Sequence, residues 1–246
     1  IHISAAQIWG CRLKVLIVIP TLNESKNISN LIFKIAKNPN LQILVIDDNS
    51  TDGTINILKR LKKRFINFNF KVRKLKKGLG SAHLDGILYA YSRKFNYCLT
   101  LDADGTHNPT DIHKLLSEIK KNKHEVINTS RFLNKKSLED WPILRRAITI
   151  LRYYLVRFFL KTIYDSSSGF RCYNIKKISI TNFRKVKNKD FFFLIEILYI
   201  LQKNNYKIKD VPIKLKYRDA GKSKMKIYHI YQSLYELILL SLRKKI

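Results

Sequence analysis

The stretch YCLTLDADGTHNP, residues 97–109, joins the pattern of a buried strand to two closely spaced carboxylates. Its first part, residues 97–104, is rich in apolar residues and predicts a strand that ends with Asp102 and Asp104. Two carboxylates separated by a single residue repel each other, so this pair calls for a positive charge nearby. Gly105 follows and leaves space for a ligand to approach.

A divalent cation suits such a pair. Mg²⁺ prefers hard oxygen ligands, and proteins commonly bind it through one or two carboxylates together with the phosphates of a substrate. Asp102 and Asp104 are therefore candidate catalytic residues and candidate ligands for Mg²⁺ or Mn²⁺. The alternative is that these aspartates only cap the next helix.

Strand and helix patterns alternate on both sides of this stretch. Strands are predicted over residues 14–20, 41–48, 68–75, 97–104 and 125–132. Helices are predicted over residues 23–37, 50–65, 78–95 and 108–122. Such alternation predicts an α/β fold built on an open, mostly parallel sheet with helices on both faces.

Polar residues follow four of the predicted strands, at the edge where an open parallel sheet binds its ligand. They are Asn23 and Glu24 after the first strand, Asp47 and Asp48 after the second, Asp102 and Asp104 after the fourth, and Arg131 after the fifth. The sequence therefore predicts one shared site at this edge. The glycines of residues 78–86 lack the spacing of a dinucleotide-binding turn, and they follow the third strand rather than the first.

The chain is strongly basic. It has 246 residues, with 48 Lys and Arg against 18 Asp and Glu, which gives a net charge of +30. This charge predicts a polyanionic partner, which is a nucleic acid, an anionic membrane surface or a phosphorylated substrate. The alternative is a lysine-rich surface that serves only solubility.

Residues 141–164 have the pattern of a basic amphipathic helix. One half of the helical wheel carries Arg145, Arg146, Arg152, Arg157 and Lys161, and the other carries Leu144, Ala147, Ile148, Leu151, Leu155, Phe158 and Phe159. The pattern predicts a helix that lies on an anionic membrane surface. The alternative is that the apolar stripe packs on the domain core while the arginines face water. Residues 225–246 repeat the theme and predict a second, C-terminal amphipathic helix.

No segment is expected to cross a membrane. A spanning helix needs about 18 or more consecutive apolar residues, and the apolar run over residues 191–201 is interrupted by Glu196. The first 14 residues contain no long apolar region, so no signal peptide is expected. We expect a protein that binds peripherally to the cytoplasmic face of a membrane.

Two further polar stretches are candidates for phosphate contact. DSSSGFRCY, residues 165–173, places small hydroxyls and a glycine before a cation. YRDAGKSKM, residues 217–225, supplies Arg218, Lys222 and Lys224. Cations at such spacing suit bound phosphates. The alternative is a solvated basic loop.

Six ordered motifs together resemble one family. They are PTLNE (20–24), VIDDNSTDGT (45–54), KKGLGSAHLDG (76–86), LDADGTHNP (101–109), DSSSGFR (165–171) and RDAGKSK (218–224). Over about residues 14–240 the chain is similar to the dolichol-phosphate mannosyltransferases and their bacterial polyprenyl-phosphate relatives, which belong to the inverting glycosyltransferase family 2. The resemblance implies the Rossmann-like GT-A fold over residues 14–224, after a tail of residues 1–13.

The resemblance also implies roles for individual residues. Pro20, Leu22 and Glu24 would line the nucleotide pocket, and Val45 and Asp47 would lie beside the base and ribose. Asp102, Ala103 and Asp104 would hold the metal and the diphosphate. Arg131, Arg218 and Lys224 would contact the phosphates of donor and acceptor. Two departures concern nucleotide and acceptor contacts: Leu22 stands where the family usually has an aromatic residue, and Thr149 and Ile150 stand where it has a Ser-Arg pair.

The implied activity is the transfer of a hexose, mannose or glucose, from a nucleoside-diphosphate sugar such as GDP-mannose to a dolichyl or undecaprenyl phosphate. A membrane protein is a further conceivable partner of such an enzyme. One alternative is a family 2 enzyme that acts on another lipid or on a glycan. An alternative of another class is a basic nucleic-acid-binding protein, although the sequence carries no helix-turn-helix, zinc-finger or aromatic RNA-binding signature.

Overall fold

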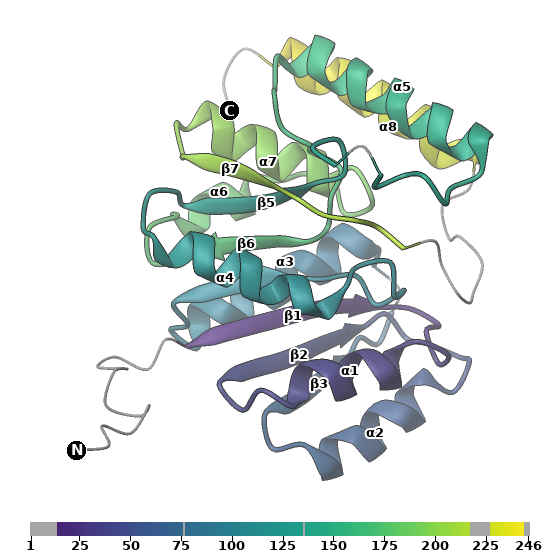
Figure 1. Ribbon diagram of the computed structural model, residues 1–246, viewed down its shortest axis with the longest axis vertical. Helices are drawn as coiled ribbons and strands as arrows, with labels where there is room; N and C mark the ends of the chain where they lie inside the picture. Colours follow the sequence, from purple (N-terminus) through teal and green to yellow (C-terminus); the bar gives the residue numbers. More distant parts are fainter. Residues whose placement is uncertain (1–13, 76, 135, 217–226, 244–246) are drawn as a thin grey trace.

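The predicted alternation of strands and helices builds one seven-stranded sheet with helices on both faces (Figure 1). The computed structural model describes residues 14–75, 77–134, 136–216 and 227–243. The mostly parallel α/β fold is therefore confirmed.

The strands are β1 (Val15–Thr21), β2 (Leu41–Asp47), β3 (Phe68–Val72), β4 (Tyr97–Thr100), β5 (Val126–Ser130), β6 (Arg171–Asn174) and β7 (Ile208–Pro212). They are arranged in the order β3-β2-β1-β4-β6-β5-β7, and β6 runs antiparallel to its neighbours β4 and β5. The first five match predicted strands, whereas β6 and β7 were not predicted. The pattern placed the end of β4 too late, because the strand stops at Thr100 and the aspartates lie in the turn beyond it.

The helices are α1 (Ile28–Ala36), α2 (Thr54–Arg64), α3 (Leu79–Ser92), the short 3₁₀ helix η1 (Pro109–Asp111), α4 (Ile112–Lys120), α5 (Ile143–Leu160), α6 (Ile180–Arg184), α7 (Phe193–Lys203) and α8 (Ile227–Leu242). The side chain of Asn108 caps η1 by accepting a hydrogen bond from the backbone N–H of Thr110 at 3.1 Å. The alternative that Asp102 or Asp104 caps this helix is therefore wrong.

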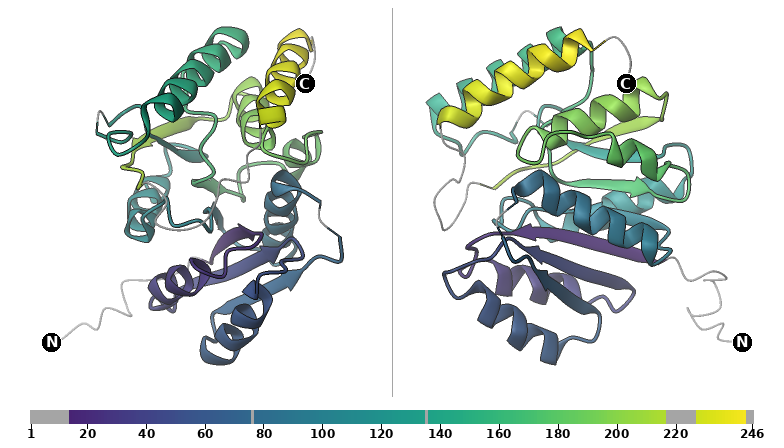
Figure 2. Two further views of the ribbon diagram at one scale, coloured as in Figure 1. Left: turned by 90° about the vertical axis from the view of Figure 1, so that its right-hand side faces the viewer. Right: turned by 180° about the vertical axis from the view of Figure 1, so that it is seen from behind.

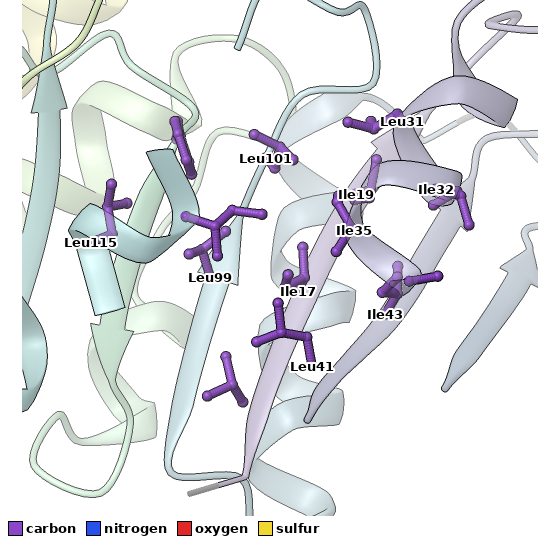
Figure 3. Close-up of a cluster of buried hydrophobic side chains, with 14 of the residues drawn as sticks. Ile17, Ile19, Leu31, Ile32, Ile35, Leu41, Ile43, Leu99, Leu101 and Leu115 are labelled. Atoms are coloured by element: carbon purple, nitrogen blue, oxygen red, sulfur yellow. The ribbon is translucent and has the colours of Figure 1, made fainter. Parts of the chain in front are cut away.

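Alternate residues of the central strand β1 serve two separate cores. Ile17 and Ile19 pack with α1, α2 and α4 on one face, and Figure 3 shows this cluster. Val18 joins the cluster of α3, α6 and α7 on the other face. Helix α3 comes so close to β1 that a Cβ added to Gly86 would lie 2.1 Å from a methyl carbon of Val18. This double burial fixes the sheet and hence the edge where its strands end.

Helices α5 and α8 lie side by side beyond this sandwich (Figures 1 and 2). Val156 and Leu160 of α5 and Leu237 and Leu240 of α8 bury their side chains in a third cluster, which also contains residues of α7 and its N-terminal turn. At the end of α8, Arg243 forms an ion pair of 2.7 Å with the buried Glu196 of α7. The helix pair is thus attached to the rest of the domain through α7.

Helix α5 turns its apolar stripe outward. Leu144, Leu151 and Phe158 are 74%, 60% and 77% exposed, whereas Thr149 and Val156 on the opposite side are buried. The alternative that the whole stripe packs on the core is therefore wrong, although Leu155 and Phe159 are partly buried in the third cluster. The reason is that α7 and α8 already provide the apolar packing that the inner side of α5 needs.

The two helices expose apolar side chains that we together call the apolar face. It consists of Ile143, Leu144, Ile148, Leu151, Tyr154 and Phe158 from α5, and of Tyr231, Leu234, Tyr235, Ile238, Leu239 and Leu242 from α8. None of the helices in the described part of the chain combines the length and the hydropathy of a membrane span.

Candidate active site

A cavity of about 800 Å³ lies at the carboxyl edge of the sheet and extends to α5, α7 and α8. The strand ends contribute Pro20, Leu22, Glu24, Asp48, Asp102, Ala103, Asp104 and Arg131 to its wall. Helices α5 and α8 contribute Leu144, Arg145, Ile148, Thr149, Leu151, Arg152, Leu155, Val156, Leu234 and Leu237. Because β6 is antiparallel, the loop before it lies at this same edge and adds Ser167 and Gly169. Most of the predicted residues therefore line one cavity.

The turn after β4 presents Asp102 and Asp104 to the cavity. One oxygen of Asp104 accepts hydrogen bonds from the backbone N–H and the hydroxyl of Thr106, at 3.1 and 2.7 Å. The side chain of Asp102 is 29% exposed, and one of its oxygens lies 3.7 Å from Nδ1 of His107. The Asp104 carboxylate is thus held by Thr106, and both carboxylates line the cavity, where a ligand can reach them.

The described residues contain no group of three or more His, Cys, Asp and Glu side chains that could hold a metal ion by themselves. The chemistry of Asp102 and Asp104 nevertheless suits Mg²⁺ or Mn²⁺, since such ions commonly take one or two carboxylates and complete their coordination with water and substrate phosphates. The two aspartates therefore fit a shared protein-substrate site rather than a closed protein cage.

The residues predicted to bind the nucleotide fall into two groups, those that line the cavity and those that are buried and do not line it. Pro20, Leu22 and Glu24 line the cavity. Val45 and Asp47 are fully buried and are not part of its wall, and the Asp47 carboxylate accepts hydrogen bonds from the backbone N–H and hydroxyl of Ser50, at 2.8 and 2.6 Å.

Asp48 lies on the cavity wall beside this turn. Its carboxylate accepts backbone hydrogen bonds from Lys77 and Gly78 and forms an ion pair of 2.8 Å with Arg73. Arg73 also donates to Gly78 O and to the hydroxyl of Ser81. The sequence placed Asp48 among the polar residues at this edge of the sheet, and the fold also uses it to join the second strand end to the loop before α3.

Three arginines gather on the α5 side of the cavity, and we call Arg131, Arg145 and Arg152 the arginine cluster. Nε of Arg131 forms a buried ion pair of 3.0 Å with Asp165. The pKa of Arg152 is lowered to about 10, mainly by burial and also by the positive charges of Arg131 and Arg145, whereas the negative charge of Asp165 acts in the opposite direction. Arg152 therefore stays protonated at neutral pH, and the cluster attracts an anion.

Two uncharged groups adjoin the arginine cluster. Thr149, one helical turn after Arg145, lines the cavity and donates its hydroxyl to Arg145 O at 2.8 Å. Trp141 is 9% exposed, and its indole N–H has no hydrogen-bond partner among the described residues. The guanidinium of Arg145 lies 4.4 Å from the centre of the Trp141 ring. Thr149 and Trp141 thus support the position of Arg145 in the cavity wall.

The arginines of α5 correct an expectation. Arg152 lines the cavity beside Arg131 and Asp165, and Arg157 donates hydrogen bonds to the Tyr153 hydroxyl at 2.7 Å and to Ile163 O at 3.2 Å. Arg157 thus has partners within the protein and Arg152 faces the cavity, so these two side chains do not form a free basic face. Arg145 and Arg152 are seven residues apart, a spacing that places both on one side of a helix, but the sequence pattern did not tell which side faces inward.

Arg218 and Lys224 lie outside the described residues, and so does the stretch around Lys222. Their contact with phosphates stays a prediction.

His107, Trp141 and Thr149 line the cavity without having been predicted as site residues.

Comparison with known proteins agrees with this arrangement. Residues 16–190 match the family described as Glycosyl transferase family 2. The polyprenol monophosphomannose synthase of Mycolicibacterium smegmatis is 28% identical over 227 residues, which cover 91% of this chain and 85% of that protein. The UDP-N-acetylglucosamine–dolichyl-phosphate N-acetylglucosaminyltransferase of Methanococcus voltae is 29% identical over 245 residues, which cover 94% of this chain and 97% of that protein.

A solved structure shares the fold. The mannosyltransferase PcManGT from Pyrobaculum calidifontis, solved in complex with GDP-Man and Mn²⁺, superposes with a TM-score of 0.59 and is 14% identical. The match covers 96% of this chain and 66% of that one. At this identity the likeness shows the fold alone.

Proposed function

This chain belongs to glycosyl transferase family 2 and is a glycosyltransferase, and on that premise we propose that it transfers mannose or glucose from a nucleoside-diphosphate sugar to a polyprenyl phosphate. The arginine cluster carries this choice of acceptor, because it lies in one cavity with the apolar side chains of α5 and α8. A polyprenyl phosphate has the same two parts, an anionic head and an apolar chain. The names of the two relatives point to the same class of acceptor, and the family match gives no support to a nucleic-acid-binding function.

On the donor side, the nucleotide would bind against Pro20, Leu22 and Glu24. We propose that the buried residues Val45 and Asp47 support the residues of this wall without contacting the nucleotide. Bound to Asp102 and Asp104, Mg²⁺ or Mn²⁺ would neutralise negative charge on the leaving diphosphate. Arg218 and Lys224 are proposed to contact the same phosphates.

On the acceptor side, the arginine cluster would bind and orient the phosphate. A phosphate monoester has its second pKa near about 6, so its attacking oxygen is largely ionised at neutral pH and needs no strong general base. The task of the protein is to align this oxygen with the anomeric carbon and to stabilise charge as it develops on the leaving group. Attack from the face opposite the diphosphate would invert the anomeric centre.

The apolar face of α5 and α8 would contact the membrane that contains the acceptor. Leu144, Ile148 and Leu151 belong both to this face and to the cavity wall, so the cavity opens onto it. Exposed apolar surface of this extent is typical of an interaction site. We propose peripheral binding to the cytoplasmic leaflet, driven mainly by apolar contact.

Replacing Tyr154, Phe158 and Tyr235 together by Ser should release the protein from lipid vesicles. Each of these side chains is at least 62% exposed on the apolar face, and none lines the cavity. Burying a large apolar side chain contributes about 1.5–3 kcal/mol, so we expect a loss of vesicle affinity of at least about tenfold. The measurement is co-sedimentation with vesicles that contain anionic lipid, at low and high salt.

A matched control is the triple Ser variant at Ile66, Leu75 and Leu133, which are 97%, 70% and 58% exposed elsewhere on the molecule. It should pellet like the wild-type protein. Equal pelleting of the two triple variants, or a complete loss of wild-type binding at moderate salt, would contradict an apolar contact with the membrane.

The acceptor itself can be tested with matched lipids. The enzyme is incubated with GDP-mannose or UDP-glucose, Mg²⁺ or Mn²⁺, and either a short polyprenyl phosphate or the polyprenol without phosphate. We expect a sugar-lipid product from the phosphate alone. Transfer to the neutral polyprenol or to a glycan at a similar rate would favour the alternative of another acceptor.

A further inference from the structure

His107 lines the cavity, and one of its two ring nitrogens is buried without a hydrogen-bond partner among the described residues. It is 4% exposed, and its ring packs against Phe170 with a centroid distance of 5.2 Å. Its Nδ1 atom is buried and has no hydrogen-bond partner among the described residues. Buried polar groups are rarely left without a partner in proteins, because the lost hydration is not replaced.

The carboxylate of Asp102 is the neighbour that Nδ1 of His107 can reach. The distance from Nδ1 to the nearer Asp102 oxygen is 3.7 Å. A hydrogen bond between such atoms is about 2.7–3.2 Å long, so a small rotation of either side chain would form it. With its proton on Nδ1, a neutral His107 is a donor, and an ionised carboxylate is an acceptor.

The backbone of Gly169 is a second close neighbour of the Asp102 carboxylate. A Cβ added to Gly169 would lie 2.6 Å from one Asp102 oxygen and 3.0 Å from the other. The Thr100 hydroxyl donates a hydrogen bond of 2.6 Å to Gly169 O and fixes this backbone in place. The Asp102 carboxylate therefore has the Gly169 backbone and the His107 ring as close neighbours, and we call this arrangement the Asp102 slot.

We propose that His107 is a positioning residue that donates its Nδ1–H to Asp102 and holds this carboxylate in the orientation in which it binds a divalent cation. Partners that orient a metal-binding carboxylate commonly change metal affinity by about 10–100-fold when they are removed. The inference rests on the proposed function only in taking Asp102 as a metal ligand. The competing explanation is that the ring merely fills space against Phe170.

The test compares His107→Leu with His107→Asn. Leu fills a similar volume without a donor, whereas the Asn side-chain amide places a donor close to the position of Nδ1. The readout is the dissociation constant of Mn²⁺, measured by electron paramagnetic resonance with GDP or UDP present, together with the thermal unfolding midpoint. We expect Leu to weaken Mn²⁺ binding by at least about tenfold and Asn to keep it within about threefold.

His83 offers a matched control. It is also fully buried, both of its nitrogens lack partners among the described residues, and its ring stacks on Phe193 at 5.9 Å, but it does not line the cavity. His83→Leu should leave the Mn²⁺ affinity unchanged. Equal Mn²⁺ affinity in both Leu variants, or equal loss in His107→Leu and His107→Asn, would overturn the positioning role.

Gly169→Ala keeps the inference testable if His107→Leu does not fold. The added methyl group would collide with the Asp102 carboxylate and displace it. It should therefore weaken Mn²⁺ binding by at least about tenfold as well. An unchanged Mn²⁺ affinity would contradict the claim that the orientation of Asp102 controls metal binding. Because these measurements need no acceptor, they separate a failure of this inference from a failure of the proposed lipid acceptor.

Discussion

Replacing Asp104 by Asn is expected to lower the rate of sugar transfer roughly a thousandfold, about 4 kcal/mol of transition-state stabilisation, while the protein stays folded. Asn has the same shape, and its carbonyl oxygen can still accept the two hydrogen bonds from Thr106. What it removes is the negative charge that the proposed Mg²⁺ or Mn²⁺ needs. The measurement is kcat with saturating Mg²⁺, beside the thermal unfolding midpoint.

Asp111→Asn is the control for this variant. Asp111 lies in the same segment after β4, is 7% exposed and forms an ion pair of 2.6 Å with Lys114, but it does not line the cavity. Its substitution should affect stability more than turnover. Near-normal turnover of Asp104→Asn with Mg²⁺ would show that the metal assignment of this aspartate is wrong.

Replacing Arg152 by Met should lower kcat/KM for a short, water-soluble prenyl phosphate about a hundredfold, or about 2.7 kcal/mol. Met keeps much of the apolar volume of the side chain but removes one of the three charges of the arginine cluster. The phosphate would lose a charge-assisted hydrogen bond in a partly desolvated site, where such bonds are strong. The KM of the nucleotide sugar should change little, because Arg152 lies on the α5 side of the cavity.

Arg146→Met separates this role from membrane binding. Arg146 lies on the same helix but is exposed and does not line the cavity. With a soluble acceptor its substitution should leave turnover unchanged. An equal loss of kcat/KM in the two variants, or an unchanged kcat/KM in Arg152→Met, would show that Arg152 does not bind the acceptor phosphate.

The arrangement of α5 suggests why one helix carries both arginines and a broad apolar stripe. Its inner side presents Arg145, Thr149 and Arg152 to the cavity, and its outer side exposes Leu144, Leu151 and Phe158. In the proposed function, the head group of the acceptor would bind on the inner side while its chain stays in contact with the apolar face. The same helix would then set the height of the reacting phosphate above the lipid.

The sequence by itself predicted the five strands that carry most of the site. Four of them, β1, β2, β4 and β5, are short runs that are buried almost throughout, and such a pattern is local. Parallel strands then bring their carboxyl ends to one edge, which places Pro20, Asp102 and Arg131 together although 111 residues separate the first from the last. The ordered motifs also predicted the family, and the family match confirmed it.

Only the tertiary structure decided which way α5 faces. A helical wheel shows that two sides of a helix differ, but the side that turns inward depends on the neighbours. Here the neighbours of the inner side are Asp165 and Arg131 as well as α7 and α8. Arg145 and Arg152 therefore line the cavity, whereas Leu144 and Leu151 stay exposed.

The slot around Asp102 also needed the fold. The antiparallel β6 is only four residues long and begins with Arg171, so its pattern is too short and too polar to be read from the sequence. Its pairing with β4 brings Gly169 against Asp102, 67 residues away along the chain. Local patterns predicted the carboxylates because strand ends are local features, whereas the partners that orient them come from pairings between distant segments, which no local pattern encodes.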